Sequence, residues 1–372
     1  MSRKFKDLVK TPRLKPWSLS RGGNRLRRST LELRVNRKIK ASVQENELMS
    51  EHTSLWVGGP ADYFSEVDNL NDLVFLYKCA RECSLPVFIL GSGTNILVGD
   101  KGIRGLVIKN QISKIAVLGK APFDFRKTGN SRRQESHWRG GFISSGDLES
   151  EEKTKDGVMV EVFSGTALSF LIGQTLKEGI TGLQWFSGIP GTVGGAVWNN
   201  IHGADHFFGD YLSEVAFIDE DLVEKRLSRE ELNLGYNCSY FQGLSKIIIS
   251  AKLLLPLGDG RRAFRVSKEW QRRKSIQPRN SAGCTFSNLT EDQAKKLNLE
   301  NCSAGFVIDK ILNLRGFRVG GAQISENHAN FIVTGENSKA GDVVKIIDTV
   351  QAACFEKLGI KLKEEIVRVG EF

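Results

Sequence analysis

The stretch Ser187-Gly188-Ile189-Pro190-Gly191-Thr192-Val193-Gly194-Gly195-Ala196 holds four glycines and a proline within ten residues. With so few side chains above the backbone, N–H groups here can approach a ligand's phosphates closely. A second turn, Gly91-Ser92-Gly93-Thr94-Asn95, follows the apolar run 87–90. Two such turns predict a cofactor with a pyrophosphate group; the alternative is a pair of tight turns in an ordinary α/β domain. Neither is the G-x-G-x-x-G of a dinucleotide-binding βαβ unit or the G-x-x-x-x-G-K-[ST] of a P-loop.

Length and composition are those of a globular protein with two domains or three small ones. The chain has 372 residues, of which 40% are hydrophobic and 26% are charged. No apolar run approaches the ~20 residues of a membrane-spanning helix, so we expect no membrane span. The six cysteines include no C-x-x-C pair. We therefore expect reduced thiols and a cytoplasmic location.

Basic residues are concentrated at the N-terminus. Residues 1–43 contain 14 Lys and Arg but only two acids, whereas the net charge of the whole chain is +10. Because this segment also lacks a sustained hydrophobic period, we expect residues 1–47 to form a disordered arm. Three roles stay open for the arm: a solvated tail, a tether to nucleic acid or an anionic surface, or an organelle transit peptide.

The rest of the sequence alternates between helical and strand-like patterns, which predicts a mixed α/β and α+β fold. A helix should begin after Asp68 or Asn69. Residues 119–156 are polar and lack order signals, so we expect a surface insertion there. The clearest other elements are the strands 87–90, 105–108, 158–163, 246–255 and 362–369, and the helices 167–177, 261–274 and 343–354.

Several motifs, taken in order, resemble the UDP-N-acetylenolpyruvoylglucosamine reductase family. Besides the two glycine turns, they are Thr53-Ser54-Leu55, Val57-Gly58-Gly59-Pro60-Ala61, Ser281-Ala282-Gly283-Cys284-Thr285-Phe286, Gly320-Gly321-Ala322-Gln323-Ile324-Ser325, His328-Ala329-Asn330-Phe331-Ile332 and Leu362 to Gly370. The resemblance implies a vanillyl-alcohol-oxidase-type (PCMH) FAD-binding fold of two subdomains over residues 48–258. It also implies a C-terminal α+β substrate domain over residues 259–372, whose last strand returns to the flavin site. The short stretch between Phe286 and Gly305 suits the family's shorter form, which lacks an extra lid segment.

The resemblance also implies an activity. In this family NADPH reduces a tightly bound FAD, and flavin N5 then delivers hydride to C3 of UDP-N-acetylglucosamine enolpyruvate while a protein acid protonates C2. The product, UDP-N-acetylmuramate, is a peptidoglycan precursor, and we expect a monomeric enzyme. Two alternatives remain. One is another flavoprotein oxidoreductase on the same scaffold, and the other is a catalytically weakened flavin-binding protein that acts through its basic arm.

The two glycine turns supply the cofactor-binding residues that the resemblance implies. These are Gly91, Ser92, Gly93, Thr94 and Asn95 in the first turn, and Gly188, Ile189, Pro190, Gly191, Thr192, Gly194 and Gly195 in the second. No metal is expected. His202 and His206 are four residues apart, but no third ligand group stands near them in the sequence.

The catalytic residues implied by the resemblance depart from the family's usual pattern at two positions. Cys284 stands where the family usually carries a serine as proton donor, and a thiol, with an ordinary pKa near ~8.5, is the better acid. The alternative is a small buried thiol with no catalytic role. Glu365 matches the family's catalytic glutamate, and strand alternation places its neighbour Glu364 on the opposite face.

The second departure is Asn237, which stands where the family places an arginine that polarises the substrate carboxylate. Asparagine can donate a hydrogen bond but carries no charge. Another cation could replace the arginine, and Arg279, Arg272 and Arg273 are the candidates. The substrate-binding residues that we expect are Tyr236, Ser239 and Arg279.

Overall fold

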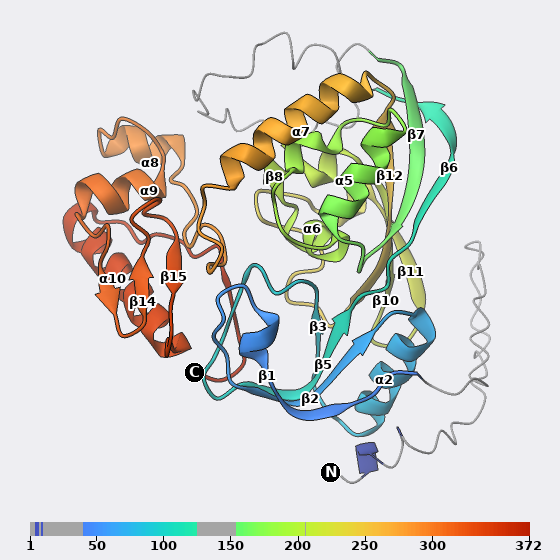
Figure 1. Ribbon diagram of the computed structural model, residues 1–372, viewed down its shortest axis with the longest axis horizontal. Coiled ribbons are helices and arrows are strands. Elements are labelled where there is room, and N and C mark those ends of the chain that lie inside the picture. Colours follow the sequence, from blue (N-terminus) through green and yellow to red (C-terminus); the bar gives the residue numbers. More distant parts are fainter. Residues whose placement is uncertain (1–3, 7–8, 10–39, 125–153, 205) are drawn as a thin grey trace.

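The first of two larger sheets has four strands and lies at the bottom of Figure 1. The computed structural model describes residues 4–6, 9, 40–124, 154–204 and 206–372. The strand order is β1 (Gln44–Leu48), β2 (Pro60–Val67), β5 (Ile103–Asn110) and β3 (Val87–Leu90). Strand β1 is antiparallel to β2, and the other pairs are parallel. Helix α2 (Leu70–Glu82) begins as predicted, because the Asn69 side chain accepts a hydrogen bond from the Asp72 backbone N–H at 2.9 Å.

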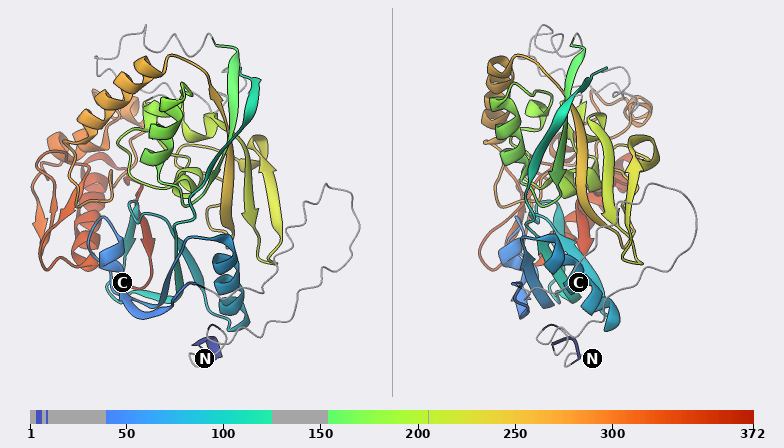
Figure 2. Two further views of the ribbon diagram at one scale, coloured as in Figure 1. Left: turned by 45° about the vertical axis from the view of Figure 1, so that its right-hand side comes forward. Right: turned by 90° about the vertical axis from the view of Figure 1, so that its right-hand side faces the viewer.

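The second larger sheet is antiparallel and has five strands. Their order is β11 (Glu224–Ser228), β10 (Leu212–Ile218), β12 (Ile247–Pro256), β7 (Asp156–Phe163) and β6 (Ile115–Pro122). Helices α5 (Leu168–Lys177), α6 (Val193–Asn199) and α7 (Gly260–Lys274) lie on one side of this sheet, which Figure 2 shows edge-on at the right.

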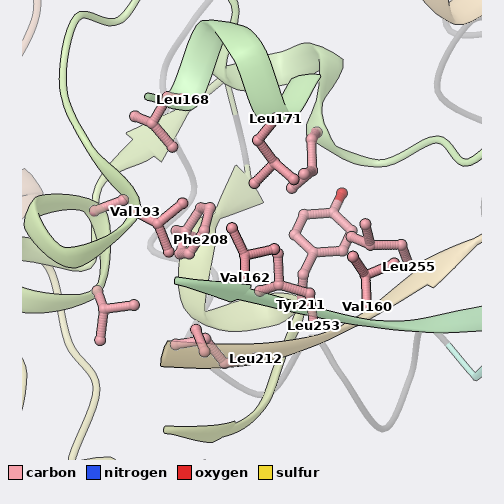
Figure 3. Packing of buried hydrophobic residues seen from close by; sticks show 14 of the residues in the cluster. Val160, Val162, Leu168, Leu171, Val193, Phe208, Tyr211, Leu212, Leu253 and Leu255 are labelled. Carbon is pink, nitrogen blue, oxygen red and sulfur yellow. The ribbon is translucent and has the colours of Figure 1, made fainter. Parts of the chain in front are cut away.

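The core between this sheet and its helices is aliphatic and aromatic. Figure 3 shows Leu168 and Leu171 of α5 facing Val160 and Val162 of β7. All four side chains are almost fully buried, and each such burial stabilises the fold by about 1.5–3 kcal/mol. This core fixes the loop that joins α5 to α6, which is the loop carrying the longer glycine motif.

A C-terminal α+β unit lies on the left of Figure 1. It contains α8 (Glu291–Lys296), α9 (Ala304–Phe306), the three-stranded sheet β13 (Arg318–Val319), β14 (Ala322–Ile324) and β15 (Ile332–Thr334), and α10 (Ala340–Leu358). The buried face of α10 includes Val343, Ile346, Ile347, Val350 and Cys354, and the helix ends at Gly359 with φ +68°. These features confirm the predicted amphipathic helix, and the mixed fold class is confirmed as well.

The final strand is shorter than the sequence suggested. We expected a strand over 362–369, but β16 comprises only Val367–Val369 and pairs in parallel with β4 (Ile96–Val98). Before it, Glu364 forms a single bridge with Phe286 of the C-terminal unit. The segment therefore changes from an isolated bridge with Phe286 to pairing with β4, and no continuous ladder forms. Its course joins the C-terminal unit to the strand that follows the first glycine turn.

The remaining short elements connect these layers. They are η1 (Met49–His52), η2 (Leu183–Phe186), β8 (His202–Gly203), β9 (His206–Phe207), η3 (Phe208–Asp210), η4 (Arg229–Leu232) and the π-helical η5 (Val307–Ile311). Within the described ranges, none of the helices combines the length and the apolar character that crossing a bilayer requires.

The N-terminal arm and the surface insertion, which we expected to lie outside the fold, are both shorter than predicted. Residues 44–47 belong to β1, and Phe5 is buried against Tyr63, with 4.9 Å between the ring centroids. Residues 119–122 and 156 extend the strands β6 and β7, since their backbone groups pair with each other. The expected disorder at 1–3, 7–8 and 10–39, and the core of the insertion at 125–153, lie outside the described residues.

Candidate functional site

The two glycine turns lie side by side although they are distant in the sequence. Thr94 Oγ1 donates a hydrogen bond to the Pro190 carbonyl at 3.1 Å, across a separation of 96 residues. A Cβ atom at Gly91 would stand only 2.7 Å from Thr192 Oγ1. A side chain at Gly91 would therefore push the turns apart. Together they form one backbone-lined surface at the junction of the two larger sheets.

The first turn has the geometry of an anion-binding loop. Gly93 adopts φ +66°, and a Cβ atom there would lie 2.0 Å from the His52 carbonyl oxygen. Only glycine fits such a position. Within the described parts of the chain, no acceptor receives the backbone N–H groups of Ser92, Gly93 or Thr94. Consecutive N–H groups of this kind suit a phosphate.

The glycines of the second loop fall into two groups, one that packs against the protein and one that does not. Gly194 donates its N–H to the Ser164 carbonyl at 2.7 Å, and a Cβ on Gly194 would approach the Ser164 Cβ to 3.0 Å. A branched side chain at Gly194 would therefore strike the end of β7 rather than a bound ligand. By contrast, a Cβ atom on Gly191 (φ +152°) or Gly195 would come no closer than 3.7 Å to any neighbour among the described residues. A Cβ atom at either position would make only ordinary van der Waals contacts, so steric packing does not require these glycines, which fits the close approach of a cofactor's diphosphate.

Glu365 is held at the centre of a second group of residues. Tyr236 Oη donates a hydrogen bond to Glu365 Oε1 at 2.9 Å, and Asn237 Nδ2 donates to the same oxygen. The Glu365 backbone N–H donates to the Thr285 carbonyl at 2.8 Å. Burial raises the pKa of Glu365 above its ordinary value, although the two side-chain hydrogen bonds act in the opposite direction. Glu364 faces away and binds Arg368 at 2.8 Å, as the predicted alternation requires.

Asn95 joins the two groups. Its Nδ2 donates to the Glu365 carbonyl at 3.4 Å, and the Asn95 carbonyl accepts from the Val367 N–H at 3.0 Å. The last residue of the first glycine turn therefore contacts the segment that carries the carboxylate. The backbone-lined surface and the carboxylate belong to one site.

Cys284 lies beside this carboxylate, on a segment that bridges to Phe331. Burial raises the pKa of the Cys284 thiol to about 12, and the charge of Glu365 adds to the shift. We expected a thiol with an ordinary pKa near ~8.5, and that expectation is wrong because burial and a neighbouring carboxylate both disfavour the thiolate. The thiol consequently keeps its proton well into the alkaline range.

The expected substrate-binding residues occupy three different environments. Tyr236 belongs to the Glu365 group described above. Ser239 is buried, and its hydroxyl donates to the Trp198 carbonyl at 2.6 Å, so the hydroxyl supports the loop. Arg279 is exposed and forms no ion pair with any described residue. Of the other candidate cations, Arg272 and Arg273 both bind Glu269, at 2.9 Å and 2.8 Å.

Lys274 is the cation that the sequence reasoning missed. It ends α7, and a Cβ on Gly188 would lie 2.8 Å from the Lys274 Cβ. Burial lowers the pKa of Lys274, and its charge acts on Cys284. No described residue accepts a hydrogen bond from Lys274 Nζ. Helical phase could have found it, because Ser267, Trp270 and Lys274 share the inward face of α7 at i, i+3 and i+7.

His202 is a second residue that the sequence reasoning did not place at the site. Its ring lies 5.0 Å from the Tyr236 ring, between centroids. His202 is an exposed residue by surface area, yet desolvation by the atoms packed around its ring lowers its pKa to about 4, with the charge of Lys274 acting in the same direction. It is therefore neutral at neutral pH.

No group of three potential metal ligands occurs in the described part of the chain. His202 faces Tyr236, whereas His206 is buried, stacks on Trp185 with 5.0 Å between centroids, and bonds Tyr211 Oη at 3.1 Å through Nδ1. The two histidines therefore contact different residues, although they are only four residues apart in the sequence.

Comparison with known proteins gives consistent results. Residues 275–369 match the family model described as "UDP-N-acetylenolpyruvoylglucosamine reductase, C-terminal domain". The chain is similar to proteins named UDP-N-acetylenolpyruvoylglucosamine reductase from Lachnoclostridium phytofermentans, at 32% identity over 88% of this chain and 92% of the relative. It is similar to one of the same name from Caldanaerobacter subterraneus, at 31% identity over 90% and 97%. The crystal structure of the Thermus caldophilus protein of that name aligns with a TM-score of 0.64 at 28% identity, over 89% of this chain and 99% of the other.

Proposed function

Because this chain belongs to the UDP-N-acetylenolpyruvoylglucosamine reductase family, we propose that Cys284 and Glu365 carry out its acid–base chemistry beside an FAD held by the two glycine turns. The chain is a flavoprotein oxidoreductase that uses FAD and NADPH and converts UDP-N-acetylglucosamine enolpyruvate to UDP-N-acetylmuramate, a peptidoglycan precursor. Its fold is the FAD-binding fold that the sequence resemblance implied.

One observation carries the proposal. The two glycine turns meet at the Thr94–Pro190 hydrogen bond, and Asn95 of the first turn contacts the Glu365 segment. A cofactor diphosphate on the turns would therefore place the rest of the cofactor beside Glu365 and Cys284. The residues assigned to it are the N–H groups of the first turn, with Gly191, Thr192 and Gly195 of the second. When bound, FAD takes a hydride from NADPH and passes one to the enol ether of the substrate.

Cys284 is the proposed proton donor. Its S–H bond breaks as a C–H bond forms at C2 of the enolpyruvyl group, and the thiolate that remains lies in the field of the Lys274 charge. The raised pKa keeps the proton on sulfur until C2 gains carbanion character. The competing role, packing alone, is opposed by the charges of Glu365 and Lys274, both of which act on the thiol.

Asn237 is the proposed polar partner of the substrate carboxylate, because it stands where the family places the arginine that polarises this group. Asn237 adopts φ +48°, a left-handed conformation that asparagine tolerates well, and its amide holds Glu365. In place of the family's arginine, we assign the missing positive charge to Lys274. Among the described cations, Lys274 is the one whose charge acts on the Cys284 thiol. Tyr236 orients Glu365 through its hydroxyl. Ser239 and Arg279 stay predictions as substrate-binding residues.

The proposal also covers the roles of the two domains, the oligomeric state and the cellular location. We assign residues 48–258 to FAD binding and residues 259–372 to the substrate, and we propose a monomer, because one chain supplies every side chain of the site. The six free thiols support a cytoplasmic location. Tethering of nucleic acid or an anionic surface by residues 1–43, and organelle targeting by them, stay predictions.

A two-part assay tests the function. Purified protein should be yellow, release FAD rather than FMN on denaturation, and oxidise NADPH only when the enolpyruvyl nucleotide sugar is present. Colourless protein that FAD cannot reconstitute would contradict the assignment. Bound FAD without sugar-dependent turnover would instead favour the weakened flavin-binding protein, and turnover with an unrelated acceptor would favour a different oxidoreductase.

A further inference from the structure

The outer face of α7 carries a line of exposed cations. Arg261, Arg265, Lys268 and Arg272 are exposed and follow one another at spacings of four, three and four residues, so they lie along one side of the helix. We call these four residues the basic stripe. The opposite face, with Ala263, Ser267 and Trp270, is buried against the protein.

Helix stability does not explain the first half of the stripe. The first turn of a helix carries partial positive charge, which disfavours a cation there. Arg261 lies in the first turn and Arg265 in the second, and the N-cap residue Asp259 is the acidic group on which both arginine charges act. Neither arginine forms an ion pair with a described residue, whereas Arg272 binds Glu269. Asp259 caps the helix without an ion pair to either arginine, and both guanidinium groups stay exposed to solvent, where they can act on ligands.

The stripe leads toward the site. Its 15-residue helix spans about 22 Å and ends at Lys274, which packs on Gly188 of the second glycine loop and acts on Cys284. In Figure 1, α7 runs from above the five-stranded sheet down toward the C-terminal unit. Exposed Arg279 continues the positive charge beyond the helix. The far end of the stripe is about three Debye lengths from the site at physiological ionic strength.

We propose that the basic stripe steers the polyanionic ligands of this site, NADPH and the UDP-sugar, and so raises their rate of association. The inference rests on the proposed function, which supplies ligands with a diphosphate and, for NADPH, a further phosphate. A line of like charges that ends at a binding site concentrates counter-charged ligands near it and acts on the association rate more than on the chemistry. Because the rest of the chain beyond residue 43 is nearly neutral, the stripe stands out against its surroundings.

An anionic membrane is the main competing partner, and one contact disfavours it. Phe264 is the large apolar side chain on the stripe, at 52% exposed. The Lys268 ammonium group lies 5.3 Å from the centre of its ring. A cation placed over the ring opposes insertion of that ring into lipid. The geometry suits small soluble anions better than a bilayer.

The test compares two triple variants of the FAD-loaded protein. One carries R261Q, R265Q and K268Q. The matched control carries K120Q, K345Q and K361Q, which remove three exposed lysines from other elements. Stopped-flow measurement of flavin reduction at low NADPH gives the association-controlled rate constant, and saturating NADPH gives the limiting rate. Both are measured at about 0.01 M and about 0.15 M ionic strength, where the Debye lengths are ~30 and ~8 Å.

The stripe variant should lose about fivefold or more in the low-salt association constant. The loss should shrink at the higher ionic strength, with the limiting rate unchanged. An effect no larger than the control's, or a loss confined to the limiting rate, would overturn the proposal. Binding of the parent protein, but not the stripe variant, to anionic vesicles or an oligonucleotide, with equal association constants, would also overturn it. If the parent fails to turn over the sugar at saturation, the proposed function fails instead.

Discussion

The two halves of the site differ in what lines them: backbone in one half and side chains in the other. The surface assigned to the cofactor consists of backbone: two glycine turns whose N–H groups and missing side chains define it. The Cys284–Glu365 group consists of side chains, drawn from the segments at 236–237, 284 and 365, with Lys274 at the end of α7. The comparison teaches that one half can be read from contiguous residues, whereas the other exists only when distant segments meet.

The two halves should also fail in different ways. A backbone surface has little freedom to adjust, because Gly93 has a carbonyl 2.0 Å from where a Cβ would stand. A side-chain group can lose one member and keep its shape, since neighbouring donors still hold Glu365. Substitutions should therefore be all-or-none in the turns and graded in the group.

The largest effect is expected for Gly93→Ala. Its added Cβ would collide with the His52 carbonyl at a left-handed φ, so the turn must deform and the purified variant should contain almost no FAD. Gly173→Ala is the matched control, because a Cβ there has no neighbour within 4 Å in helix α5. The control should retain FAD fully and gain slightly in stability. Flavin absorbance per protein measures both, and normal FAD content in Gly93→Ala would remove the distinction between the halves.

The next effect concerns Cys284→Ala. Flavin reduction by NADPH should be unchanged, whereas reoxidation by the enolpyruvyl sugar should slow by at least ~10²-fold, the lower range of general acid catalysis. Cys284→Ser should recover much of the rate, because serine is the family's usual residue here. Stopped-flow measurement of both half-reactions decides the matter. Equal, unslowed reoxidation in the Ala and Ser variants would assign Cys284 to packing.

Cys284 also leads to a prediction about how the reoxidation rate depends on pH. The partly buried thiol, with its pKa raised to about 12, stays protonated as the pH rises through the range where a fully exposed thiol ionises. The reoxidation rate of the parent protein should therefore not fall near pH ~8.5. The Cys284→Ser variant should show the same pH profile in this range. Such a loss, restored in the serine variant, would mean that the thiol is more exposed to solvent than its surroundings indicate.

The smallest effect is expected for Asn237→Gly. Glycine keeps the left-handed backbone but removes one of the two hydrogen bonds to Glu365, and a bond to a charged group is worth about 1.5–3 kcal/mol. Reoxidation should slow by about tenfold, with FAD content unchanged. Asn233→Gly is the control, because Asn233 is also left-handed, at φ +47°, and makes no contact with Glu365. A loss of FAD in Asn237→Gly would show that the two halves are coupled rather than separate.

Sequence patterns predicted the regular elements well where a single period dominated. Helices α2 and α10 were predicted from apolar spacing, α2 also from its cap, whereas α7 was predicted from the basic run 261–274. The final strand was overestimated because alternation alone does not reveal that Glu364 makes only an isolated bridge to Phe286, whereas Val367 pairs with β4. The insertion was overestimated at both ends for a similar reason, since β6 and β7 pair with each other across it.

The sequence by itself determined the glycine turns, the position of Cys284 and Glu365 and the family, because these depend on residue types in contiguous runs. Only the tertiary structure decided that Lys274, and not Arg272, Arg273 or Arg279, brings positive charge to Cys284. It also decided the protonation of that thiol and the separate tasks of Gly191 and Gly194. The physical reason is that desolvation, charge–charge interaction and steric contact depend on distances between segments far apart in the chain, and no local pattern encodes those distances.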